Sequence, residues 1–181
     1  MEKGEKRKFL PKRGQKKERK GQMNLSFGMM FSIILIIVFI AFAFFAIGKF
    51  LDIQKAAKTG QFIDALKTDV NRMWKSSQGS QQVNYSLPTS VDYLCFADFE
   101  AVKKGVNQSL YYDLNFVYFE KNNMIFYPVG SAGGIDAIKL ENINLAKITS
   151  SDNPYCIKNA KGKIKLTIKK NIDESTVTIT R

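Results

Sequence analysis

"RKGQMNLSFGMMFSIILIIVFIAFAFFAIGKF", residues 19–50, is the stretch of sequence that decides the fold. From Leu25 to Gly48 it has 24 residues without a charge, and 15 of them are Leu, Ile, Phe or Val. A membrane-spanning helix needs about 20 apolar residues, and each of these four residue types favours insertion by roughly 0.3 to 0.6 kcal/mol. A buried core helix would need a larger surrounding core than the remaining chain supplies. The sequence therefore predicts one transmembrane helix over residues 22–51, with the lipid bilayer as a partner.

Positive charge gathers ahead of this helix. Of the net charge of +12, residues 1–20 contribute +7, from ten Lys or Arg against three Glu, and the rest of the chain is nearly balanced. Positive residues flank the cytoplasmic end of a transmembrane helix. Residues 1–21 are therefore predicted to be a basic cytoplasmic leader or tail, with the C-terminal domain outside the cell membrane. Nucleic acid is not expected as a partner, because that interaction needs a basic face on a folded domain.

A cleavable secretory signal is the alternative interpretation of the apolar segment. Ala41-Phe42-Ala43 has the small-x-small form of a signal-peptidase site. The apolar run before it is longer than the usual 7–15 residues (about two to four helical turns), and it continues beyond the site through Phe44, Phe45 and Ile47. We therefore expect the helix to be retained.

The residues that precede the span resemble a known leader. A basic segment ends in Lys20-Gly21, Gln22 follows, and an unbroken apolar helix comes next. This order is similar to the class III signal of archaeal type IV pilin-like proteins. The resemblance implies that a class III signal peptidase cuts between Gly21 and Gln22 on the cytoplasmic side, and that the retained helix mediates self-association. It covers the leader and the N-terminal helix only.

Three later positions refine this resemblance. Asn24 stands where the family has a small polar residue, and Phe27 stands where it often has an aromatic one. Ser26 stands where the family has a Glu, which is thought to pair with the freed amine of a neighbouring subunit. A buried amine without its carboxylate is costly. Ser26 therefore favours a second hypothesis, an unprocessed membrane-anchored binding or accessory protein whose outer β domain contacts another envelope component.

The helical pattern continues beyond the membrane segment. Apolar residues recur at helical spacing between Ile53 and Met73, and no Pro interrupts residues 22–79. Two arrangements stay open: one helix that becomes amphipathic over residues 52–79, or a membrane helix and a separate second helix with a break near Gly48. In both, the apolar face, with Trp74 at its end, is expected to cover a β-sheet.

Residues 80–181 have β character and are predicted to form an extracytoplasmic domain. Alternating apolar residues and turn residues predict strands at Val83–Leu87, Val91–Phe96, Tyr111–Glu120, Met124–Val129, Lys163–Lys169 and Thr176–Thr180. Tyr111–Glu120 with Met124–Val129, and the last two strands, are expected to form hairpins. The predicted fold class is α+β: a long N-terminal membrane helix continuing into an amphipathic helix, followed by a small antiparallel β-sheet domain.

The composition limits the chemistry that the protein can perform. The chain has no His, which excludes Ser/His and Cys/His nucleophile pairs, and Cys95 and Cys156 are its only cysteines. They are too few for a structural zinc site without His, but an extracytoplasmic location permits a disulfide between them. Two free, buried cysteines are the alternative if the domain faces the cytoplasm. No catalytic, cofactor-binding or metal site and no small-molecule substrate is predicted, so we do not expect an enzyme.

Overall fold

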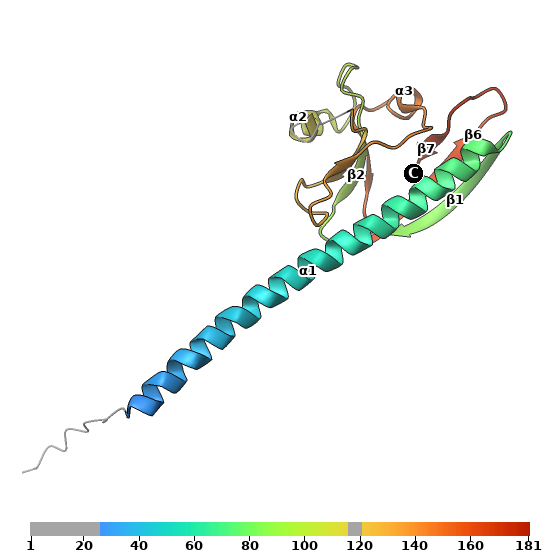
Figure 1. The fold of residues 1–181 in the computed structure, drawn as a ribbon. Helices are drawn as coiled ribbons and strands as arrows, with labels where there is room; N and C mark the ends of the chain where they lie inside the picture. The colour runs from blue at the N-terminus through green and yellow to red at the C-terminus, as the bar shows by residue number, and fades with distance from the viewer. Residues whose placement is uncertain (1–25, 116–120) are drawn as a thin grey trace, which may run out of the picture. The chain divides into compact units, whose positions relative to one another are not determined.

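The computed structural model describes residues 26–115 and 121–181. A long helix, α1 (Phe27–Lys75), precedes two antiparallel sheets, which confirms the predicted α+β class (Figure 1). The helix continues through Gly48 and Gly60, so the arrangement with a single helix is the one observed. The boundary between two structural units falls inside this helix, after Phe42.

In the first unit, Ser26 begins the helix. Its Oγ accepts a hydrogen bond from the Met29 backbone N–H at 3.4 Å, and its carbonyl oxygen accepts one from the Met30 N–H at 3.2 Å. Ser is a favoured residue at the N-cap because its hydroxyl satisfies one of the free N–H groups of the first turn. Ser26, which departs from the pilin-like pattern, is thus the residue that caps α1.

In the second unit, the C-terminal half of α1 forms one wall of the main hydrophobic core. The Phe62 ring meets the rings of Tyr85 and Phe126 edge to face, with centroids 5.4 and 5.9 Å apart, an arrangement that aromatic pairs prefer. The buried residues of the helix recur every three or four positions: Thr59, Phe62, Ile63, Leu66, Val70 and Met73. This spacing is that of one helix face.

The ends of the predicted apolar face lie outside this core. Ile53 is 66% exposed, because burial of the helix begins only at Thr59. Trp74 is 39% exposed, and its indole N–H donates to the carbonyl oxygen of Ser175 at 3.0 Å. An indole satisfied in this way sits at the rim of a core, with its polar edge paired.

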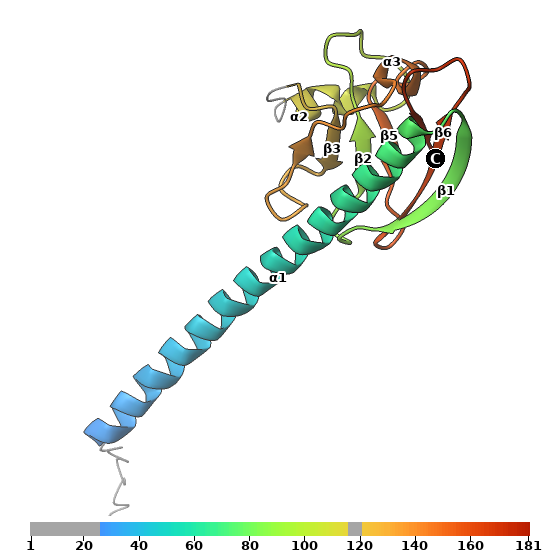
Figure 2. The ribbon, with the colours of Figure 1, turned by 45° about the vertical axis from the view of Figure 1, so that its right-hand side comes forward.

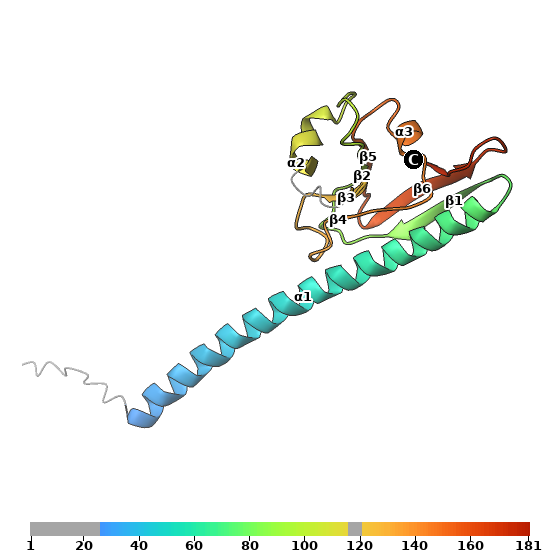
Figure 3. The ribbon, with the colours of Figure 1, turned by 45° about the horizontal axis from the view of Figure 1, so that its top comes forward.

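The three-stranded sheet lies against α1. Its strands are β1 (Gly79–Ser86), β6 (Lys163–Lys170) and β7 (Thr178–Thr180), in the order β1-β6-β7 with antiparallel pairing. On β6, the buried Ile164, Leu166 and Ile168 alternate with more exposed residues. Figure 3 shows β1 and β6 beside the C-terminal half of α1. The predicted hairpin between the last two strands is confirmed.

The four-stranded sheet is buried on both faces. Its strands are β2 (Tyr93–Phe96), β3 (Met124–Tyr127), β4 (Ala137–Ile138) and β5 (Tyr155–Lys158), in the order β4-β3-β2-β5. Figure 2 shows β3, β2 and β5 as neighbours. One face of the sheet joins the main core, and the other forms a second core with the short helix α2 (Tyr111–Asn115). The remaining short helices are η1 (Gln108–Leu110) and α3 (Leu145–Ile148).

Two expectations for the β domain were wrong. The predicted strand Tyr111–Glu120 is helical at Tyr111–Asn115, while residues 116–120 lie outside the described part. Leu110 and Leu114, four residues apart, both join the second core, a contact that helical geometry allows. Consequently β3 pairs with β2 and β4 instead of forming a hairpin with this segment. The described strands also form two sheets where one was expected.

A buried tyrosine joins β1 to the helix. The hydroxyl of Tyr85, a residue only 6% exposed, donates to Oδ2 of Asp69 at 2.6 Å, and Arg72 pairs with the other carboxylate oxygen at 3.0 Å. Burial raises the pKa of Tyr85 above its ordinary value of 10.0, and the hydrogen bond to Asp69 raises it further. Tyr85 therefore stays neutral in the folded state at a pH where it would ionise in the unfolded chain.

Tyr85→Phe should reduce the loss of stability at alkaline pH. Between the unfolded pKa of about 10 and the higher folded pKa, the folded state holds one more proton, so the free energy of unfolding falls as pH rises. Phe removes this contribution. Chemical denaturation of the full chain in detergent, between neutral pH and about pH 11, should give a shallower decline than in wild type. Tyr112→Phe, at a residue 65% exposed, is the control and should match wild type; identical slopes for all three proteins would contradict the assignment.

Candidate functional site

The largest apolar surface of the described chain is the helix before the β domain. Every residue from Ser26 to Gln54 is exposed, although most of them up to Leu51 are apolar. Soluble proteins rarely expose apolar patches beyond a few hundred Å². Among the described residues, α1 is the one helix long and apolar enough to cross a membrane. At about 1.5 Å per residue, the segment from Phe27 to Gly48 is roughly 33 Å long, close to the hydrocarbon thickness of about 30 Å.

The first charges after the apolar segment lie on the next turns of α1. The Lys49 ammonium is 5.9 Å from the centre of the Phe45 ring, and Asp52 pairs with Lys55 at 3.5 Å. One turn later the β domain contacts the helix. Gly133, at φ +73°, lies so close to Ala56 that a Cβ on it would be 2.3 Å from the Ala56 nitrogen. A residue without a side chain is therefore required there.

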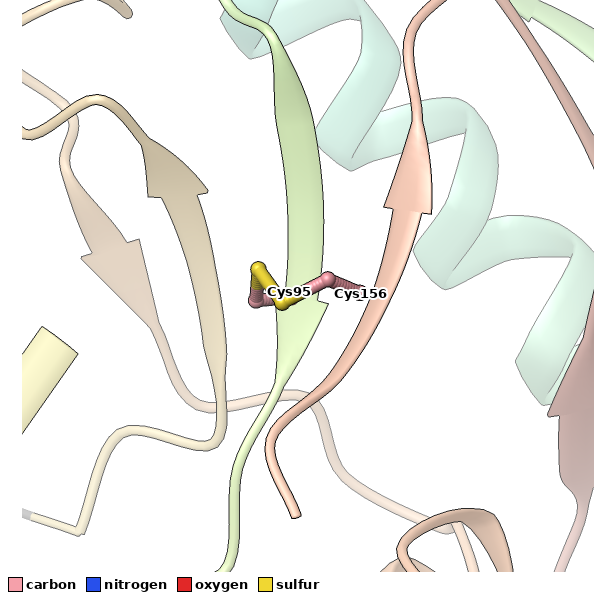
Figure 4. The surroundings of a disulfide bond; sticks show 2 residues. All are labelled: Cys95 and Cys156. Atoms are coloured by element: carbon pink, nitrogen blue, oxygen red, sulfur yellow. A yellow bond between two sulfur atoms is a disulfide. The ribbon is translucent and has the colours of Figure 1, made fainter. Parts of the chain in front are cut away.

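The two cysteines form a disulfide between neighbouring strands (Figure 4). Cys95 on β2 and Cys156 on β5 are direct partners in the antiparallel register, with Cα atoms 4.0 Å apart. Cys95 is fully buried and belongs to the second core with Ile125 and Leu114. The bond thus ties the edge strand β5 to the centre of its sheet.

Buried asparagines hold the chain at both ends of β5. Asn153 donates from Nδ2 to the Asp98 carbonyl at 2.7 Å and accepts from the Asp98 N–H at 3.0 Å. Asn159 donates from Nδ2 to the carbonyl oxygens of Pro88 and Val91 at 2.9 and 2.7 Å. The Asn153 side chain thus pairs with a donor and an acceptor of its loop, and that of Asn159 with two acceptors, so β5 is fixed at both ends as well as by the disulfide.

A groove of about 610 Å³ runs along β5. Tyr155–Lys158 form one side, and the start of β6 contributes to the other. The cationic side chains on its lining are Lys158, Lys163, Lys165 and Arg181, and the one acidic side chain is that of Asp152. All four cationic residues are exposed, and none forms an ion pair with a described residue. These residues were not singled out from the sequence, although the alternation of Lys with Ile and Leu in "KIKLTIK" already indicated a basic strand face.

The other predicted site residues have different outcomes. Gly21 and Gln22, the predicted processing site, lie outside the described residues. Within the described ranges, no group of three or more Cys, Asp or Glu residues is placed to hold a metal ion. The side chains brought together are therefore those of the disulfide and the basic groove.

Comparison with known proteins gave no match: no family model, curated protein or solved structure resembles this chain significantly.

Removing the disulfide should destabilise the β domain strongly. The bond closes a loop between residues separated by 61 positions, and the chain-entropy model gives about 4 kcal/mol for a loop of that size. Cys95→Ser with Cys156→Ser should lower the free energy of unfolding by roughly that amount, measured by urea denaturation in detergent. Reductant should destabilise wild type similarly and leave the double variant unchanged. Two thiols labelled in wild type under denaturing, non-reducing conditions would contradict the bond.

Proposed function

We propose that this protein is a single-pass membrane-anchored envelope protein that resembles a type IV pilin-like subunit and has a structural, non-catalytic role. The observation that carries the proposal is that the surroundings of α1 differ between its two halves. The helix is exposed and apolar over its first half and forms one wall of the core of the β domain over its second half. One helix thus carries both the apolar segment and the residues that pack in the β domain.

The charge pattern supports an orientation. Ten basic residues precede the span, whereas the first turns after it carry both signs, at Lys49, Asp52 and Lys55. The positive-inside rule then puts the N-terminus in the cytoplasm and the β domain outside. The disulfide is consistent with this orientation because it requires an oxidising compartment. From Gly48 to Ala56, which lies against Gly133 of the domain, the distance along α1 is about 12 Å, so the domain would lie close to the membrane surface.

A second candidate function is that of an unprocessed, anchored binding or accessory protein. The specific observation that favours it is Ser26, which caps α1 through its hydroxyl and offers no carboxylate to the amine of a neighbouring subunit. The basic groove along β5 also favours a binding role. Both candidates share the anchor and the outer domain, and they differ in whether residues 1–21 are removed.

Intact mass of the membrane-extracted protein distinguishes these candidates. Under the pilin-like proposal, the mass should correspond to a chain that begins at Gln22 and keeps the whole apolar helix. Gly21→Phe should block this processing, because a bulky side chain obstructs the approach to the scissile peptide bond, while insertion persists because the apolar content of the span is unchanged. Gly14→Phe, in the same basic segment, is the matched control and should be processed normally.

Other masses lead to other conclusions. A full-length chain would support the permanent anchor and reject the leader. Loss of everything up to Ala43 would establish a secretory signal and reject both candidates.

Protease accessibility tests the orientation. Protease added to intact cells should digest residues 80–181 and spare residues 1–20 of any unprocessed chain, because only the β domain is expected outside. Permeabilised cells serve as the control in which both parts become accessible. Protection of the β domain in intact cells would reverse the proposed topology.

A further inference from the structure

The edge strand β5 presents backbone hydrogen-bonding groups to the groove. In the strand order β4-β3-β2-β5, β5 has a neighbour on one side only. The Cα atoms of Cys95 and Cys156 are 4.0 Å apart, which is the short spacing of a non-hydrogen-bonded antiparallel pair rather than the spacing of about 5.5 Å in a hydrogen-bonded one. The N–H and C=O of Cys156 therefore point away from β2.

The neighbouring residues agree with this alternation. The Asn159 N–H donates to the Asp92 carbonyl at 2.8 Å, so Asn159 faces the β2 side. Since the direction of the backbone N–H and C=O alternates along a strand, those of Lys158 point to the same outer side as those of Cys156. Four consecutive residues, Tyr155–Lys158, line the groove, so the groove follows the open edge of the strand.

The charge around this edge is positive. Lys158 lies on β5 itself, and Lys163 and Lys165 lie on β6, with Asp152 as the one acidic side chain of the lining. The Asp152 carboxylate already accepts a hydrogen bond from the Val106 N–H at 2.9 Å. Long-range attraction at the groove therefore selects for a negatively charged partner.

We propose that this groove binds an extended acidic peptide segment of a partner protein, which adds as a strand to the open edge of β5. The main chain of the segment would pair with the outward groups of Cys156 and Lys158, and its carboxylates would face the three lysines. Other polyanions share the charge, but a polypeptide in extended conformation is the one that also carries a matching ladder of amides and carbonyls. The proposal adds a partner to the second candidate function. It rests on that function only in that the β domain is taken to be a binding module.

The position of β5 is already fixed before a partner strand binds. The disulfide fixes β5 to β2, and Asn153 and Asn159 fix the segments at its two ends. A rigid edge loses little conformational entropy on binding.

Binding is tested on the full chain in detergent with a fluorescent peptide of alternating Val and Glu. Fluorescence anisotropy should detect binding that weakens as salt increases, and the same peptide with Lys in place of Glu should not bind. Two further peptides carry N-methyl groups on all Val or on all Glu residues. The peptide with methyl groups on the amides that face β5 should lose binding, whereas the other should keep it.

Substitutions separate the charge from the backbone contribution. Lys163→Glu with Lys165→Glu should weaken binding by about tenfold or more, while Lys169→Glu, on the same strand beyond the groove, should have little effect. Lys158→Gln removes a charge, whereas Lys158→Pro also removes the outward N–H without breaking a bond to β2. The Lys158→Pro protein should therefore bind the peptide about fivefold more weakly than the Lys158→Gln protein.

Amide hydrogen exchange provides a readout that does not depend on a variant folding. On addition of the Val-Glu peptide, the N–H of Cys156, Lys158 or both should gain protection, and that of Ile157, which faces β2, should not change. Equal binding of the parent and both methylated peptides would mean attraction by charge alone and would overturn the proposal. So would binding of polygalacturonate at these lysines without binding of the peptide. Neither result would alter the intact mass or the protease pattern, so the anchor is tested independently.

Discussion

The rest of the structure depends on a single helix that must suit two environments. From Phe27 to Gly48, α1 is apolar on every side, and such a helix is stable only where apolar side chains need not face water. From Thr59 to Met73 it is apolar on one face, which the β domain covers. The change takes place within about three turns that carry Lys49, Asp52, Lys55 and Lys58. The backbone stays helical through these turns, so both kinds of residue belong to the same element.

Periodicity predicted the elements whose own residues determine them. The apolar run, the helix face with Leu66 and Val70, and the hairpin of β6 and β7 all follow from local patterns that long-range contacts reinforce. The pairing of Cys95 with Cys156 was favoured because the charge flanks predict an extracytoplasmic domain and these are its two cysteines. The helix face and the hairpin bury their apolar residues in the β domain, whereas the apolar run stays exposed.

Elements that depend on distant contacts were not predictable in the same way. Tyr111–Asn115 fits a strand pattern as well as a helical turn, and the choice depends on Leu114 packing against Ile125, which lies in another element. The strands of the four-stranded sheet are apolar on both faces, so their sequences give no alternation from which to infer a second sheet. The groove was missed because its lysines come from two strands, and only the tertiary fold brings Lys158 near Lys163.

The register of β5 on β2 determines both the disulfide and the residues whose amides face the open edge. A disulfide across neighbouring antiparallel strands suits a non-hydrogen-bonded pair, where Cβ atoms approach closely. In this register the amide of Cys156 points outward, so the register decides which residues of β5 present their N–H and C=O at the unpaired edge. An exposed edge invites pairing between copies of a chain, and lysines beside it oppose this because two copies would bring like charges together. The same lysines leave the edge open to a strand of opposite charge. Contacts between copies of this protein in a filament would therefore be made by the apolar helix and not by the β domain.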